Sequence, residues 1–192
     1  MYFIYDETRC DVLVQRKTVM ETWPELHKAV REALKSLSPG GGSTMVAADL
    51  GCSSGPNTLL VASEVMNTIG ALVQETADNY RSRAIMEVQF FLYDLPGNDF
   101  NLVFRSLENL QNLASETEAD DPELPCYVAG LPGSFYTRLF PSNSVHLFHS
   151  SYSLMWQSKV LPPSPIQINK FLELFYGGRE NTLVLSVFLF SS

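Results

Sequence analysis

Cysteine is scarce in this sequence, with three among 192 residues. Cys10, Cys52 and Cys126 are widely spaced, so they form neither a Cys-x-x-Cys pair nor the framework of a disulfide-rich domain. Free thiols at such spacing are typical of a reducing compartment. We therefore expect a cytoplasmic protein that owes its stability to a packed core.

Basic residues are also few, with 13 Lys and Arg against 21 Asp and Glu, a net charge of -8. Nucleic-acid binding needs a basic face, so we expect no nucleic-acid partner. The start, Met1–Glu7, lacks the basic and apolar regions of a signal peptide. The late apolar run Leu183–Phe190 is too short to span a bilayer, so we expect a buried strand there and no membrane partner.

Hydrophobic residues, in contrast, make up 45% of the chain, and charged residues only 18%. This composition can bury a substantial core and is unlike that of a disordered chain. The length is that of one ordinary domain, so residues 1–192 are expected to form a single domain.

The stretch Val46–Thr58 predicts a strand, a tight turn and a helix. Gly51 and Gly55 lack a Cβ, so the backbone can turn sharply there and lie close to a ligand. Pro56 suits the first turn of a helix, where its missing N–H costs little. In open α/β sheets, turns of this kind at the carboxyl end of a strand bind ligands.

Strands and helices alternate along the rest of the chain. The spacing of Trp23, Leu26 and Val30 predicts a helix from Arg16 to about Leu37, whereas residues 1–15 show no clear period. Further helices are expected after the turn (59–73), at 100–113 and at 166–175, and strands at 86–92, 126–129, 145–151 and 183–190. The acidic segment 115–125 is expected to be a loop. This order predicts an α/β fold with a doubly wound, mostly parallel sheet covered on both faces.

The turn itself is compatible with several ligands or reactions. No lysine follows Gly55, so a phosphate-binding P-loop is not expected, and the dinucleotide pattern Gly-x-Gly-x-x-Gly is absent. The residues do satisfy Gly-x-Ser-x-Gly, in which Ser53 would be a nucleophile with His146 or His149 as its base. Only one predicted helix precedes the turn, however, whereas a hydrolase elbow normally follows several strands.

A different function follows from Asp49 and Asp94, which end successive strands on one edge of the predicted sheet. An acid after the second strand is placed to accept the ribose hydroxyls of a nucleoside. Asp49 and the turn would face the other end of the ligand. A nucleoside that carries a cation and no pyrophosphate fits both acids, and S-adenosylmethionine is such a ligand.

Four motifs carry a resemblance to a known family. In order, Asp49–Thr58, Asp94–Asn101, Gly133–Tyr136 and Ser150–Trp156 resemble the plant SABATH methyltransferases, over about residues 13–160. The resemblance implies a class I methyltransferase, Rossmann-like fold. It also implies methyl transfer from S-adenosylmethionine to the carboxylate of a small plant acid such as salicylate or benzoate, by a homodimer.

The resemblance also implies which residues form the site. Those for the cofactor are Asp49, Gly51, Ser53, Asn57, Asp94, Leu95, Ser134 and Phe135; those for the acceptor are Gln15, Met155 and Trp156. Met155 resembles the salicylate and benzoate branch. No metal and no catalytic acid–base group is expected, because a carboxylate acceptor is already ionised at neutral pH. A catalytic His–Asp pair is accordingly neither evident nor required.

The sequence departs from the family at three places. Val12 stands where a serine is usual, after Asp11 in place of asparagine, and Tyr93 replaces an asparagine. The segment Gly177–Arg179 arrives early, so we expect the helical cap domain to be missing and activity to be impaired. The alternative function is a catalytically inactive cofactor-binding or dimerisation module of the same family.

Overall fold

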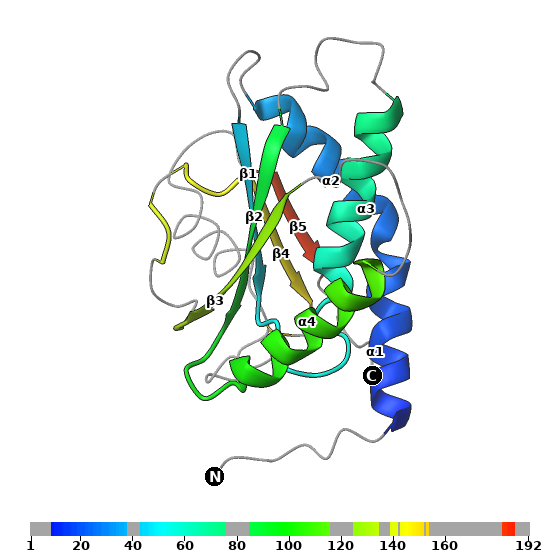
Figure 1. Cartoon of the computed structure of the whole chain (residues 1–192), viewed down its shortest axis with the longest axis vertical. Helices are drawn as coiled ribbons and strands as arrows, with labels where there is room; N and C mark the ends of the chain where they lie inside the picture. Colours follow the sequence, from blue (N-terminus) through cyan, green and yellow to red (C-terminus); the bar gives the residue numbers. More distant parts are fainter. Residues whose placement is uncertain are drawn as a thin grey trace, which may run out of the picture.

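The computed structural model describes residues 9–37, 43–75, 85–115, 125–134, 139–141, 143–151, 153 and 182–186. The strands of these ranges form one parallel sheet in the order β3-β2-β1-β4-β5 (Figure 1). Their bounds are β1 (Ser43–Leu50), β2 (Ile85–Asp94), β3 (Cys126–Pro132), β4 (Leu147–Ser151) and β5 (Thr182–Ser186).

The strand order reverses at β1. From this central strand the chain adds β2 and β3 on one side, and β4 and β5 on the other. The predicted doubly wound α/β fold is therefore confirmed. All the described strands point the same way, so their carboxyl ends lie along one edge, at the bottom of Figure 1. The switch point between β1 and β4 on this edge is where such sheets bind ligands.

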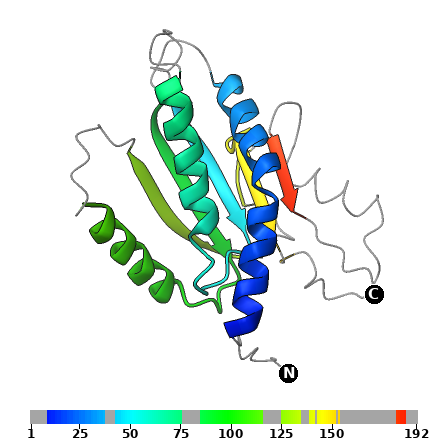
Figure 2. The same ribbon diagram turned by 90° about the vertical axis from the view of Figure 1, so that its right-hand side faces the viewer.

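The described helices all pack on one face of the sheet (Figure 2). They are α1 (Arg9–Glu21), α2 (Trp23–Ser36), α3 (Leu60–Glu75) and α4 (Phe100–Ser115). In sequence, α3 links β1 to β2, and α4 links β2 to β3. The predicted helices at 59–73 and 100–113 are confirmed. Asp99 Oδ1 accepts a hydrogen bond from the N–H of Leu102 (3.0 Å) and so caps α4.

The amino-terminal helix differs from the prediction. A single helix was expected from Arg16, but the chain is helical from Arg9 and breaks at Thr22 between α1 and α2. Pro24 explains the break, because its missing N–H and its ring suit only the first turn of a new helix. Leu13 and Val14 on α1 are exposed (58% and 53%), so the earlier helix carries no clear apolar period.

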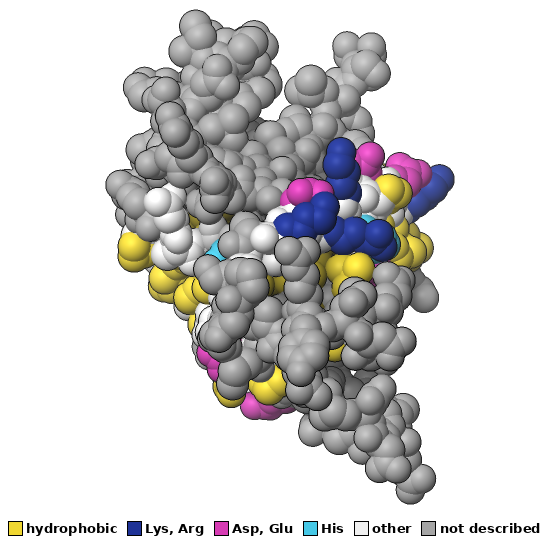
Figure 3. Space-filling model, turned by 90° about the horizontal axis from the view of Figure 1, so that it is seen from above, with side chains coloured by type: hydrophobic (Ala, Val, Ile, Leu, Met, Phe, Trp, Pro, Cys, Tyr) yellow, Lys and Arg dark blue, Asp and Glu magenta, His cyan; other side chains and the backbone are white. Residues whose placement is uncertain are grey.

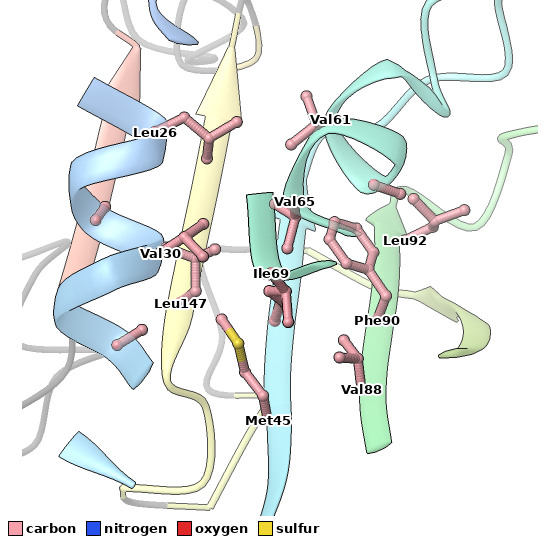
Figure 4. Close-up of a cluster of buried hydrophobic side chains, with 14 of the residues drawn as sticks. Leu26, Val30, Met45, Val61, Val65, Ile69, Val88, Phe90, Leu92 and Leu147 are labelled. Atoms are coloured by element: carbon pink, nitrogen blue, oxygen red, sulfur yellow. The ribbon is translucent and has the colours of Figure 1, made fainter. Parts of the chain in front are cut away.

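The core lies between the sheet and its helices. In Figure 4, Leu26 and Val30 of α2 and Val65 and Ile69 of α3 point toward the side chains of the central strands, Phe90 among them. A second buried cluster comprises Ala48, Leu50, Tyr93, Val145 and Phe148. Strand residues thus alternate between two clusters, as expected for a sheet buried on both faces.

Charged side chains gather over one part of the opposite end of the molecule, at the amino-terminal ends of the strands (Figure 3). Seen from that end, side chains of both signs lie next to one another (Figure 3). The ion pair of Lys35 with Glu32 (2.7 Å) on α2 is one such contact. No helix among the described residues is long and apolar enough to cross a membrane.

Several sequence predictions lie outside the described residues. They concern 116–124 of the acidic segment, the helix at 166–175, and residues 187–190 of the last strand. The final strand, expected at 183–190, is confirmed in part by β5 (Thr182–Ser186). The strands expected at 86–92 and 126–129 are confirmed as β2 and β3, and the one expected at 145–151 is confirmed as β4, which begins two residues later, at Leu147. The single domain over residues 1–192 stays a prediction.

Replacing Ile69 tests the packing of α3 on the sheet. Ile69 is completely buried, so Ile69→Ala should lower the free energy of unfolding by about 2–5 kcal/mol. Asn67→Ala is the matched control, because Asn67 is exposed on the same helix and should change stability by less than about 0.5 kcal/mol. Urea denaturation followed by circular dichroism measures both, and equal losses would contradict this packing.

Candidate cofactor-binding site

The turn after β1 is fixed to the end of β2. The carbonyl oxygen of Tyr93 accepts hydrogen bonds from the N–H groups of Gly51 (2.8 Å) and Cys52 (3.0 Å). Gly51 has a φ of 80°, and Ser53 has a φ of 60° and is exposed. A Cβ on Gly51 would lie 2.1 Å from the Cβ of Ser153, so only glycine fits there.

Two serines tie the turn to the segment after β4. The hydroxyls of Ser150 and Ser153 lie 3.1 and 2.8 Å from the carbonyl oxygen of Leu50. They also lie within hydrogen-bond distance of each other. The motif Ser150–Trp156 thus supports the turn through its first residues, while Met155 and Trp156 lie outside the described residues.

Asp94, at the end of β2, is held by two backbone groups. Its Oδ2 accepts from the N–H of Ser53 (2.6 Å), and its Oδ1 accepts from the N–H of Leu95 (2.7 Å). Each carboxylate oxygen can accept a second hydrogen bond. Asn98, which the sequence analysis did not select, donates to the carbonyl oxygen of Ser53 (2.9 Å). Asp94 therefore has a fixed orientation and still has acceptor capacity.

The loop after β3 joins the same group of residues. The N–H of Gly133 donates to the carbonyl oxygen of Asp94 (2.8 Å), and Ser134 follows directly. Leu95 is 56% exposed on the neighbouring loop. Leu95 and Ser134, which the resemblance predicts to contact the adenine, thus lie on either side of Asp94. Phe135, the third residue predicted for the adenine, lies outside the described residues.

Asp49 lies deeper than the other predicted cofactor residues. It is 5% exposed, and its Oδ1 lies 2.7 Å from Nδ1 of His149 on β4. The sequence analysis did not identify this contact, and its prediction that no catalytic His–Asp pair is required is not tested by it. The two residues are 100 positions apart and become neighbours only because β1 and β4 pair at the switch point. Strand order, which sequence spacing does not reveal, brings them together.

Helix α1 contacts the segment that follows the turn. Asn57 Nδ2 donates a hydrogen bond to the carbonyl oxygen of Val12 (2.9 Å). The contact uses the backbone of Val12, so it does not depend on the serine side chain that is usual at this position. Gln15 lies half-buried one turn further along α1, on the side of Val12. The predicted acceptor residue is thereby brought to the carboxyl edge.

The described residues do not support the hydrolase interpretation. Nδ1 of His146 accepts from the N–H of Val46 (3.0 Å), and His149 pairs with Asp49, so neither histidine is hydrogen-bonded to Ser53. Burial lowers the pKa of His146. The pKa of the Cys52 thiol is raised, first by burial and then by the charges of Asp49 and Asp94. Cys52 is thus a protonated side chain of the turn and not a nucleophile.

Comparison with known proteins agrees with this geometry. Residues 10–170 match the family described as SAM dependent carboxyl methyltransferase. The chain therefore belongs to this family of S-adenosylmethionine-dependent enzymes, and the predicted resemblance is confirmed.

Individual relatives extend this result. The chain is 44% identical over 165 residues to anthranilate O-methyltransferase 3 of Zea mays, covering 84% of the chain and 42% of the relative. It is 43% identical over 162 residues to benzoic acid/salicylic acid carboxyl methyltransferase 3 of Petunia hybrida, with coverage of 82% and 41%. A solved loganic acid methyltransferase with SAH matches with a TM-score of 0.57 and 32% identity, over 78% of this chain and 38% of that one. The chain thus spans about two fifths of the length of these relatives.

Gly51→Ala tests the geometry of the turn. The new Cβ would collide with Ser153 and would occupy a backbone conformation that disfavours side chains, so stability should fall by about 2 kcal/mol or more. Gly70→Ala is the control: no atom lies within 4 Å of its added Cβ, and alanine favours the helix by about 0.5–1 kcal/mol. The melting temperature should fall for Gly51→Ala and rise for Gly70→Ala. A shift of both melting temperatures in the same direction would contradict the described turn.

Proposed function

We propose that this chain binds S-adenosylmethionine at the carboxyl edge of its sheet and transfers the methyl group to the carboxylate of a small plant acid. The observation that carries the proposal is Asp94, fixed by the N–H groups of Ser53 and Leu95 beside the switch point. The names of the relatives indicate the acceptor class, which includes anthranilate, benzoate and salicylate.

The proposed recognition of the cofactor follows from the hydrogen-bond inventory of Asp94. Its carboxylate has about four acceptor positions, and two are taken by backbone N–H groups. The remaining two suit the paired hydroxyls of a ribose. Leu95, Ser134 and Phe135 would then contact the adenine, and Asp49, Gly51, Ser53 and Asn57 would lie toward the methionine end.

The proposed reaction needs positioning more than acid–base chemistry. A carboxylate oxygen attacks the methyl carbon, the new C–O bond forms as the C–S bond breaks, and neutral S-adenosylhomocysteine leaves without any proton transfer. The two opposite charges cancel during this step, so a pocket with little water favours it. Gln15 and Trp156 are neutral donors that could hold the acceptor carboxylate in line with the methyl group.

A second candidate function is a cofactor-binding or dimerisation module without activity. The contacts of Asp94 support cofactor binding by such a module as well as by the enzyme. Binding of the cofactor is thus common to the enzyme and to a cofactor-binding module, and only the reaction distinguishes these two.

Asp94→Asn tests cofactor binding. An amide offers one acceptor oxygen in place of two and points an NH2 at a backbone N–H, so affinity for S-adenosylhomocysteine should fall about 10–100-fold. Asp99→Asn is the matched control: it removes the same charge, five residues further on, while asparagine remains a good helix cap. Isothermal titration calorimetry measures both, and equal effects would argue against the ribose contact.

The reaction is tested with the wild-type chain. Incubation with S-adenosylmethionine and anthranilate, benzoate or salicylate, followed by mass spectrometry of the products, should detect the methyl ester. Binding of S-adenosylhomocysteine without any ester would reject the enzyme and support the inactive module. Absence of binding would reject the proposed function as a whole.

Gln15→Glu tests the acceptor side. The substitution keeps the size of the side chain but places a negative charge beside the acceptor carboxylate, so KM for the acid should rise about tenfold or more. The affinity for S-adenosylhomocysteine should stay within about twofold. Gln89→Glu is the control, because the Gln89 amide bonds to the carbonyl oxygen of Tyr127 between β2 and β3. Steady-state kinetics with varied acceptor distinguishes the two variants.

A further inference from the structure

The pair of Asp49 and His149 is the least expected feature of the switch point. The two residues are direct partners in the parallel register of β1 and β4. Their side chains are 7% and 2% exposed, and the carboxylate Oδ1 lies 2.7 Å from the imidazole Nδ1. A carboxylate is thus buried immediately before the cofactor turn, with an imidazole as its partner.

The hydrogen bonds define the state of the imidazole. An ionised carboxylate only accepts, so Nδ1 carries the proton and donates it to Asp49. Nε2 of His149 is buried without a hydrogen-bond partner among the described residues. Nε2 therefore adds no second contact to the pair, and the hydrogen bond between Nδ1 and Asp49 is the one that orients the ring. His149 thus serves as a single, directed donor.

The pair is a poor choice for stability alone. A buried carboxylate loses its hydration, and a single hydrogen bond from His149 does not fully repay that loss. The same two strand ends carry a second connection, from Ser150 and Ser153 to the carbonyl oxygen of Leu50. Both connections lock the last residues of β1, and only the pair with His149 fixes a charged group.

We propose that His149 is a positioning residue, which holds the carboxylate of Asp49 oriented toward the positively charged methionine end of the cofactor. This inference rests on the proposed function. A negative charge at the floor of the turn would attract the cofactor ammonium group in a site of low dielectric. Loss of the donor would leave the buried carboxylate without the hydrogen bond that fixes its orientation.

Other ionisable groups surround the pair. The Cys52 thiol of the turn and the Asp94 carboxylate at the end of β2 lie near enough that both acids raise the pKa of that thiol. The phenol of Tyr93 on β2 has its pKa raised to about 12, by burial and then by Asp94. Both groups stay protonated between pH 6 and 8. No lysine or arginine within the described ranges forms an ion pair with Asp49. The test of the proposal therefore removes the imidazole of His149.

The test compares two substitutions of His149 with one of His146. His149→Asn retains a donor near the position of Nδ1, whereas His149→Leu removes it at similar volume. His146→Asn is the control, since its side-chain oxygen can still accept from the N–H of Val46. Calorimetry then gives the Kd of S-adenosylhomocysteine for each variant at several values of pH between 6 and 8.

The leucine variant alone should lose affinity. Without the donor the carboxylate of Asp49 is no longer held toward the cofactor, so the Kd should rise about tenfold or more. The wild type, His149→Asn and His146→Asn should stay within about threefold of one another at each pH. A leucine variant whose Kd matches the wild type throughout would overturn the proposal, and so would an asparagine variant that fails equally.

A double-mutant cycle shows whether His149 acts through Asp49. In an Asp49→Asn background the charge is already absent, so His149→Leu should change the Kd less than about twofold. A purely structural role would produce the same loss in both backgrounds and would overturn the proposal.

Absence of S-adenosylhomocysteine binding by the wild type would reject the proposed function, and with it the role of the pair toward a cofactor.

Discussion

The candidate site depends on one bifurcated contact: the carbonyl oxygen of Tyr93 accepts from both Gly51 and Cys52. This acceptor at the end of β2 fixes where the turn after β1 can go. The left-handed Gly51 then passes too close to Ser153 for any side chain, and Ser53 is left with its N–H on Asp94. Parallel pairing of β1 with β2 makes the contact possible, because it brings the ends of both strands to one edge. The conformation of the turn after β1 is thus a consequence of sheet register.

The sequence predicted those features that depend on local pattern. Alternating apolar runs and periodic helices identified the strands and three of the four described helices, and the position of Asp94 after the second apolar run placed it at the correct edge. Gly51 and Asp94 could be selected because a tight turn and a strand-end acid are recognisable from neighbouring residues. The family could be named because four motifs occur in order, which no single short pattern would have justified.

The features that were missed depend on contacts between distant residues. His149 meets Asp49 across a strand pair that sequence order does not specify, and Asn57 meets the backbone of Val12, which has no side-chain signal. Helix α1 was placed too late because Leu13 and Val14 face solvent and obscure its period. Asn98 supports the turn through the carbonyl oxygen of Ser53, 45 residues away in the sequence. Polar contacts between residues of different helices, strands and loops are therefore the features that are hardest to predict from the sequence.

Asp94 and Asp49 carry the same carboxylate group, but their different surroundings suit them to different tasks. Asp94 is half-exposed and held by backbone donors, which leave its outer lone pairs available for hydroxyl groups. Asp49 is buried and held by a side chain, so its charge acts at the floor of the turn. A backbone donor cannot be mutated away, whereas an imidazole can be lost in a single substitution. On the proposed function, family members that keep the turn but lose this histidine should retain the ribose contact while losing affinity for the methionine end.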